Sequence, residues 1–207
     1  MTEKEKQQFE TYDRMMRAVP RMKPRGHGIL INAIPETELS IRIRDGTASR
    51  YEVFFETFKS IRGKDFNNRL NDYLKESEDT DMSYRNNCHR RAFNAAIQKK
   101  DTNNYALLSA LYLLTANYEL WKCTRDYVVG NTVCFEQITL PNCTEDQYAL
   151  YCAAKDLYLG TKHMSIADLA NSKQIAPQTF AIICNAMTVR RFGIGALKSM
   201  ENEEAQK

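Results

Sequence analysis

Hydrophobic spacing along the first 80 residues changes from helical to alternating and back to helical. Thr2–Val19 and Asp65–Glu76 have apolar residues three and four positions apart, which predicts two amphipathic helices. Between them, Ile29–Ile34 and Leu39–Arg44 predict strands, because apolar and polar side chains alternate cleanly in the second of these segments. The spacing of Tyr51–Phe58 is compatible with a returning strand or with a helix.

A turn signal and an acidic stretch divide the first half of the chain. Asp45-Gly46 follows the second predicted strand, and this dipeptide is typical of the tight turn of a β-hairpin. The acidic segment Glu76–Asp81 has no hydrophobic periodicity and predicts a domain boundary. We therefore expect an N-terminal module with a helix and a β-hairpin over residues 1–80, and a second domain over residues 81–207.

Helical spacing dominates the second domain. The pattern predicts helices over 84–100, 102–118, 119–128 and 144–160. The last of these begins with a capping box formed by Thr144 and Gln147 and stops at Gly160. Thr132–Leu140 is the one segment with a strand-like composition. The expected fold class is α+β, mainly α: a small N-terminal α/β-hairpin module followed by a helical domain.

The segment Ser165–Met187 has the spacing of a helix-turn-helix. Ser165 and Asp168 form a capping box for a short first helix, and Ala170 is the small residue where a second helix crosses. Pro177 suits the first turn of that second helix. Apolar residues on both sides of the turn fix the crossing: Ile166, Leu169, Ile175, Phe180 and Ile183.

Two features of this segment depart from the pattern of DNA-binding proteins. Gln174 occupies a turn position where Gly is usual, and Ala181 and Ile182 are apolar where side chains that contact bases are normally polar. The alternative is a helical hairpin whose second helix is buried on both faces or mediates dimerisation. The candidate nucleic-acid-binding residues are Lys173, Gln178, Thr179, Asn185, Arg190 and Arg191.

Positive charge is clustered along the chain although the net charge is only +3. Residues 85–100 include five basic side chains and no acidic one. Arg42, Arg44 and Arg50 share one side of the predicted hairpin. Together with Arg90 and Arg91 they form a second candidate basic surface. The alternative is that each cluster is a solvated face without a partner.

The sequence contains little that indicates catalysis or metal binding. It has three histidines and six cysteines. The neighbours Cys88 and His89 would point in different directions on a helix. No cysteine pair has the spacing of a zinc site. We therefore expect no enzymatic activity, no catalytic residue, no metal site and no cofactor.

The apolar segments are short and the chain begins with charged residues. The longest apolar run, Tyr105–Leu114, is too short to cross a bilayer. The first ten residues are mostly charged or polar and contain no apolar run, so we expect no secretory signal. These observations predict a cytoplasmic protein with reduced thiols and no membrane partner.

Three stretches of the C-terminal half carry a resemblance: NNYALLSALYLLTANYELW, LYCAAKDLYLGTKHMSIADLA and ICNAMTVRRFGIGAL. They resemble uncharacterised proteins with a helix-turn-helix-like segment that are encoded on conjugative elements, plasmids and prophages of Gram-positive gut bacteria. The resemblance covers a little under half of the chain. It implies mobile-element biology and names no reaction. Small proteins of this kind are often regulators, and some resemble anti-CRISPR proteins.

The predicted function is therefore that of a DNA-binding accessory or regulatory protein of a bacterial mobile element. A homodimer is expected, because operator recognition favours two-fold symmetric pairs. The alternative is a counter-defence, anti-CRISPR-like protein that inhibits a nucleic-acid enzyme, such as a CRISPR nuclease, by direct protein binding.

Overall fold

The computed structural model describes residues 37–76 and 83–201 and shows a mainly helical fold with one small antiparallel sheet. Its elements are α2 (Glu38–Asp45), α3 (Arg50–Phe58), α4 (Lys64–Glu76), α5 (Asn87–Ile97), α6 (Tyr105–Thr115), α7 (Tyr118–Thr124), the 3-10 helix η1 (Arg125–Tyr127), β1 (Val128–Val129), β2 (Thr132–Val133), the 3-10 helix η2 (Phe135–Gln137), α8 (Glu145–Leu159), α9 (Ile166–Ala170), α10 (Pro177–Phe192) and α11 (Gly195–Glu201).

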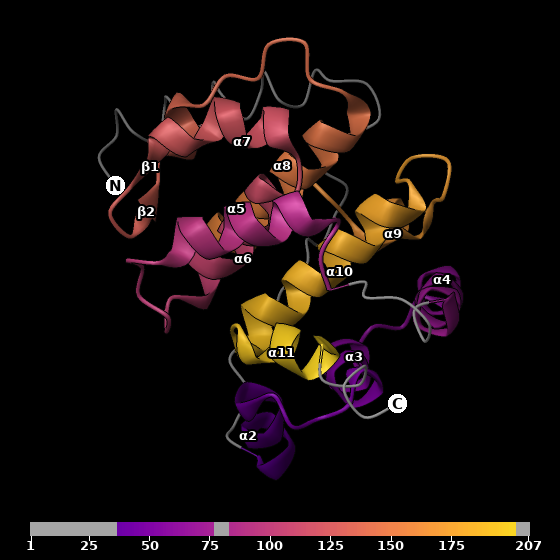
Figure 1. The fold of residues 1–207 in the computed structure, drawn as a ribbon. Helices are drawn as coiled ribbons and strands as arrows, with labels where there is room; N and C mark the ends of the chain where they lie inside the picture. Colours follow the sequence, from indigo (N-terminus) through magenta and orange to yellow (C-terminus); the bar gives the residue numbers. More distant parts are fainter. Residues whose placement is uncertain (1–36, 77–82, 202–207) are drawn as a thin grey trace.

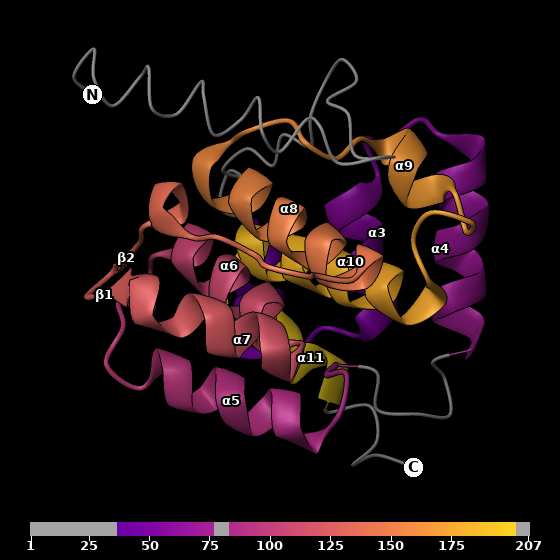
Figure 2. The ribbon, with the colours of Figure 1, turned by 90° about the horizontal axis from the view of Figure 1, so that it is seen from above.

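Helix α10 lies at the centre of the fold (Figure 1). Helices α6 and α8 pack against it from one side, and α2, α3 and α11 pack against it from the other. Every residue from Thr179 to Val189 is buried. Viewed from above, α5 lies at one edge of the molecule and α4 at another (Figure 2).

Helices α6 and α8 form the layer next to α10, and their sequences explain why they are buried. In α6, all residues from Leu107 to Thr115 are buried, as expected for a helix that is apolar on all sides. In α8, the predicted capping box of Thr144 and Gln147 is confirmed. The predicted stop at Gly160 is also confirmed, since this residue ends the helix with a φ of 70°.

The prediction that Leu39–Arg44 is a strand is wrong, because this segment lies within helix α2. Thr37 and Ser40 form a capping box that starts the helix, and Ile43 is its fully buried apolar residue. Gly46 adopts a φ of 75° and donates its N–H to the carbonyls of Arg42 and Ile43. The Asp-Gly signal therefore marks a helix C-cap, which needs the same left-handed backbone as a hairpin turn.

Of the two structures open for Tyr51–Phe58, the helix is confirmed, because this segment lies within α3. A capping box of Ser49 and Glu52 begins it, and this Ser-x-x-Glu spacing is visible in the sequence. The first predicted hairpin strand, Ile29–Ile34, and the helix predicted over Thr2–Val19 lie outside the described residues.

The strand predicted over Thr132–Leu140 is present only at its start. Thr132 and Val133 form β2, which pairs with β1 across a two-residue turn at Gly130-Asn131. The remainder contains η2 and extended chain that buries Phe135 and Ile138. Apolar residues in this segment therefore cover the end of the helical core without extending a sheet.

The helical elements predicted within Ser165–Met187 are present. The capping box of Ser165 and Asp168 starts α9, and Pro177 occupies the first turn of α10. Helix α9 packs mainly against α4. The link is reinforced by Arg69 of α4, which donates hydrogen bonds to the carbonyls of Leu169 and Ile175 on either side of the turn.

Residues from both predicted domains contribute to one hydrophobic cluster, in which Phe54 and Phe66 lie with Phe180 and Leu111. The close approach of α11 to α2 requires Gly195, because a Cβ atom there would overlap the carbonyl of Arg44. The domain boundary predicted near residue 80 stays a prediction, and residues 77–82 lie outside the described part of the chain.

Candidate nucleic-acid interface

Helix α10 is the predicted DNA-contacting helix, and one of its five candidate residues, Gln178, is exposed. The Thr179 side chain is buried and its hydroxyl donates a hydrogen bond of 2.9 Å to Asp146. Ala181 and Ile182 are buried as well. Thr179 and Asn185 are predicted to contact bases, and the structure places both side chains in the interior, where they serve the packing of α10.

Asn185 is the centre of a buried polar network that joins four helices. Its amide oxygen accepts a hydrogen bond of 3.1 Å from Tyr73, and its amide nitrogen donates one of 3.2 Å to Tyr112. Tyr73 in turn accepts a hydrogen bond from Arg50. Burial raises the pKa of Tyr112 well above its ordinary value, so its hydroxyl stays neutral. A buried amide that satisfies partners on α4 and α6 fixes the position of α10.

Arg190 and Arg191 lie in the last turn of α10 and make hydrogen bonds within the protein. Arg190 donates to the carbonyl of Leu157 at 3.0 Å, and Arg191 donates to the carbonyl of Thr57 at 3.0 Å. Arg191 also lies 3.6 Å from the carboxylate of Glu56. Burial lowers the pKa of both guanidinium groups, without removing their charge at neutral pH. Both arginines therefore anchor α10 to α3 and α8.

Gln178 and Lys173 are the two candidate residues of this segment that are exposed. Gln178 is in the first turn of α10, and Lys173 is in the loop that precedes it. With Thr179 and Asn185 buried, these two side chains do not make a continuous polar surface along α10.

The second candidate basic surface is divided by the fold. Arg50 is buried and bonded to Tyr73, and Arg42 makes a two-pronged ion pair with Glu52 at 2.9 and 3.1 Å. Arg44 is exposed in the last turn of α2. The predicted ribbon of arginines is therefore absent from the described residues. Arg90 and Arg91 lie instead on α5, on a different part of the molecule (Figure 1).

Helix α5 presents a polar and positively charged side to solvent. Asn87, Arg91 and Asn94 are exposed and spaced four and three residues apart, so they form one stripe along the helix. Arg90 and Lys99 are exposed beside this stripe. Within the described part of the chain, neither Arg91 nor Lys99 forms an ion pair.

The opposite side of α5 holds the helix rigidly on α6. His89 and Phe93 are buried four residues apart, and the His89 ring lies 2.8 Å from the carbonyl of Tyr112 through Nε2. Desolvation is the main reason that the pKa of His89 falls to about 4, which keeps the ring neutral at physiological pH. The stripe is thus built on an ordered helix, which lowers the entropy cost of presenting it.

Tyr84 supports the edge of the charged stripe. The Arg90 guanidinium lies over the Tyr84 ring, 5.7 Å from its centroid, and the centroid of the Tyr112 ring lies 5.8 Å from that of Tyr84. At the other end of the helix, Lys100 donates a hydrogen bond to the carbonyl of Gly130 and ties α5 to the hairpin turn. Arg90 is therefore held in place by an aromatic ring, and Lys100 uses its ammonium group for a contact within the protein.

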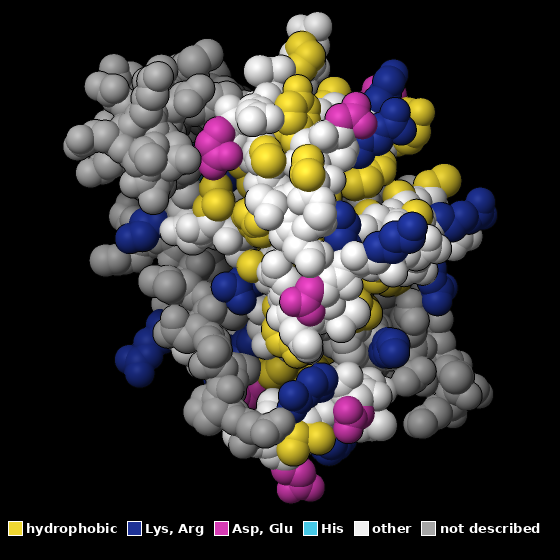
Figure 3. Space-filling view, turned by 90° about the vertical axis from the view of Figure 1, so that its left-hand side faces the viewer, with side chains coloured by type: hydrophobic (Ala, Val, Ile, Leu, Met, Phe, Trp, Pro, Cys, Tyr) yellow, Lys and Arg dark blue, Asp and Glu magenta, His cyan; other side chains and the backbone are white. Residues whose placement is uncertain are grey.

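On the face drawn in Figure 3, Lys and Arg side chains lie on both sides and near the bottom, with hydrophobic side chains and single acidic ones between them. Comparison with known proteins gives no match: no protein-family model, no curated protein and no solved structure is similar to this chain. The resemblance to mobile-element proteins therefore stays a prediction.

A buried Asp–His pair between α8 and α9 escaped the sequence analysis. Asp156 accepts hydrogen bonds from the backbone N–H groups of His163 and Met164 and from the hydroxyl of Thr161. The His163 ring lies 2.8 Å from the same carboxylate. These contacts fix the loop that joins α8 to α9. Gly160 ends α8 between Asp156 and His163, so no helical periodicity in the sequence points to this pair.

The described residues also bear on metal and membrane binding. Among them, no group of three or more His, Cys, Asp or Glu side chains is arranged to hold a metal ion. Within the same residues, no helix combines the length and the apolar character needed to cross a membrane. All six cysteines are free thiols, and burial raises the pKa of Cys152 and Cys184 far above the ordinary value.

Proposed function

We propose that the protein binds nucleic acid through the phosphate backbone, using the outward side of α5, and that it acts as a DNA-binding accessory or regulatory protein. The observation that carries this proposal is the stripe of Asn87, Arg91 and Asn94 with Arg90 and Lys99 beside it, in a segment with no acidic residue. Arginine, lysine and amide side chains are the groups that most often donate hydrogen bonds to phosphate oxygens.

The dimensions of α5 suit contact with several phosphates. Eleven residues of helix are about 16 Å long. A DNA strand has one phosphate per about 3.4 Å of axis, so a helix of this length lies alongside about five of them. The stripe offers charge and hydrogen-bond donors without the pattern of side chains that reads bases, so the expected binding is weakly dependent on sequence.

A salt series tests this proposal. Binding of a labelled DNA duplex is measured by fluorescence anisotropy from about 50 to about 200 mM salt. Three neutralised phosphates give a log–log slope of about −2.7, which is a loss of about 40-fold in affinity over this range. Arg90→Ala with Arg91→Ala should make the slope about two units shallower and weaken binding at least tenfold.

A matched variant separates this interface from general charge. Lys162→Ala with Lys198→Ala also removes two positive charges, but from exposed positions away from α5. The loss of DNA affinity in this variant should therefore be much smaller. A third variant, Lys173→Ala with Gln178→Ala, reports on the loop before α10. Unchanged binding by the Arg90/Arg91 variant, together with a loss in the Lys173/Gln178 variant, would refute the proposal and move the interface to that loop.

A further inference from the structure

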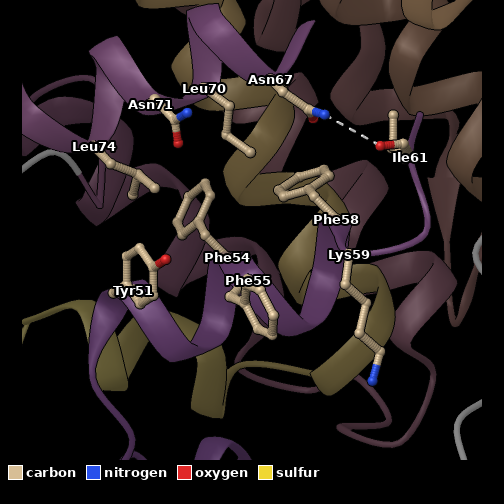
Figure 4. A pocket seen from close by; sticks show the side chains of 10 residues that line it. All are labelled: Tyr51, Phe54, Phe55, Phe58, Lys59, Ile61, Asn67, Leu70, Asn71 and Leu74. Carbon is tan, nitrogen blue, oxygen red and sulfur yellow. Dashed lines mark hydrogen bonds between the residues drawn. The ribbon is translucent and has the colours of Figure 1, made fainter. Parts of the chain in front are cut away.

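A groove between α3 and α4 leaves aromatic side chains in solvent (Figure 4). Its volume is about 330 Å³. Tyr51, Phe54, Phe55 and Phe58 line it from α3, at the spacing i, i+3, i+4, i+7. This spacing places all four on one side of the helix. Phe54 and Phe58 form the buried floor, whereas Tyr51 is 63% exposed and Phe55 is 57% exposed.

Helix α4 supplies the opposite wall with the same spacing. Asn67, Leu70, Asn71 and Leu74 follow one another at i, i+3, i+4, i+7. In Figure 4, Leu70 points across the groove toward the α3 aromatics, while Asn67 donates a hydrogen bond to the carbonyl of Ile61. Two helices whose facing residues have the same spacing form a groove into which a third, amphipathic helix can pack.

The exposed aromatic pair is the part of the groove that the fold leaves uncovered. The Tyr51 and Phe55 rings are stacked, with centroids 6.2 Å apart and an interplanar angle of 15°. An exposed apolar surface next to a cleft is a feature of interaction sites. A cavity of about 150 Å³ holds a benzene ring, so this groove has room for about two bulky apolar side chains.

The charges around the groove favour an acidic partner. Among the described residues, Lys59 is the one charged side chain that lines it. Lys64 precedes Asn67 by three residues and Lys75 follows Asn71 by four, so both exposed lysines lie along the groove side of α4.

Both acidic residues of α3 are engaged within the protein. Glu52 is paired with Arg42 at 2.9 Å. Glu56 is buried and contacts both Lys59 at 2.6 Å and Arg191 at 3.6 Å. Hydrogen bonds from the Ser49 backbone and from Arg42 lower the pKa of Glu52, so it stays ionised in its pair. On α4, the exposed Asp65 and Asp72 are not three or four residues from any groove-lining residue of that helix, so they lie on another side of it. The charge nearest to the groove is therefore positive.

We propose that this groove binds an acidic amphipathic helix of a partner protein. The partner inserts apolar side chains spaced i, i+3, i+4 or i+7 between α3 and α4, and its carboxylates lie next to Lys59, Lys64 and Lys75. This surface is separate from the stripe on α5, so it does not depend on nucleic-acid binding. It gives the protein a place to engage a second protein while α5 is occupied.

The test uses designed, labelled peptides of about 16 residues and the full chain. One peptide has Leu at the four groove-facing positions and Glu at the outward ones. A second replaces each Glu by Lys, and a third has the acidic sequence scrambled to destroy the Leu spacing. Fluorescence anisotropy should show binding of the acidic amphipathic peptide at least tenfold tighter than of either control.

Variants of the protein locate the binding. Phe55→Ala should weaken binding of the acidic peptide at least tenfold, and Lys59→Ala should weaken it about threefold. Tyr118→Ala, which removes another exposed aromatic side chain on α7, should leave it unchanged. Phe55 is mostly exposed, so its replacement leaves the fold intact, which circular dichroism checks.

Three outcomes would overturn the proposal. Equal binding of the amphipathic and scrambled peptides would show that the groove does not select an amphipathic helix. Self-association in analytical ultracentrifugation that disappears in Phe55→Ala would identify a second copy of this chain as the occupant. Loss of DNA affinity in Phe55→Ala would assign the groove to nucleic acid.

Discussion

The chain contains two Arg-Arg pairs in helices, Arg90-Arg91 on α5 and Arg190-Arg191 on α10, and the fold uses them in opposite ways. Arg190 and Arg191 are partly buried and donate hydrogen bonds to carbonyls of α8 and α3. Arg90 and Arg91 are exposed on the outward side of α5. The same dipeptide thus anchors a central helix in one place and forms a charged surface in the other.

The difference lies in the rest of each helix. Helix α10 is surrounded by five others, so its polar residues must find partners inside the protein, and Asn185 and Arg191 do. Helix α5 packs mainly on α6 through His89 and Phe93, which leaves its opposite side to solvent. A basic cluster is therefore available to a partner only when its helix lies at the edge of the fold.

The largest effect is expected from the centre of α10. Asn185→Ala removes the amide that joins Tyr73 to Tyr112 and leaves buried hydroxyl groups without that partner. The expected loss in free energy of unfolding is about 3 kcal/mol. Thermal unfolding should show a melting temperature about 9 °C lower.

Gln178→Ala, at an exposed position on the same helix, is the control for this variant. Its expected change in stability is below about 0.5 kcal/mol. Equal stability of the two variants would contradict the idea that α10 is held by its buried polar contacts.

A smaller effect on stability is expected from protonation of His89, on the buried side of α5. Its pKa is about 4 in the folded protein and about 6.5 when unfolded. Below pH of about 6.5, the unfolded chain gains a proton that the folded protein does not, so stability is full above this pH and falls as the pH decreases toward about 4. The loss attributable to His89 should reach about 2 kcal/mol at pH of about 5.

His89→Gln isolates this contribution, because glutamine keeps an N–H for the carbonyl of Tyr112 and does not titrate. Urea unfolding of both proteins is measured at several pH values between about 7.5 and about 5. The wild-type protein should lose more stability than the variant over this range. Parallel pH profiles would show that His89 is accessible to protons in the folded state.

Local signals in the sequence predicted the helices well. The capping boxes at Thr144 and Ser165 placed the starts of α8 and α9, and Gly160 placed the end of α8. These signals depend on hydrogen bonds between residues three or four apart, so they are visible without the fold. The error at Leu39–Arg44 also comes from relying on a local pattern. Alternation over six residues fits a strand, but it fits equally a short helix with one buried apolar residue, Ile43.

The candidate site was harder to predict because burial depends on contacts between distant segments. Nothing local distinguishes Arg191, whose carbonyl partner is Thr57, from Arg91, which points to solvent. Asn185 contacts residues 73 and 112, more than 70 positions away. The apolar Ala181 and Ile182 are the sequence signal that α10 is buried, since both occupy positions that an exposed helix would fill with polar side chains.

The smallest expected change in stability comes from replacing one arginine of each pair. Arg191→Ala removes a hydrogen bond to the carbonyl of Thr57 and a contact with Glu56, so we expect a loss of about 1.5 kcal/mol in the free energy of unfolding. Arg91→Ala removes an exposed side chain, and its expected loss is below about 0.5 kcal/mol. DNA affinity should show the reverse order, because Arg91 is exposed whereas the Arg191 side chain is only 14% exposed and bonded within the protein. Urea unfolding and anisotropy on the same two variants measure both quantities. If Arg191→Ala weakened DNA binding without lowering stability, α10 would be part of the interface and the division between the two helices would fail.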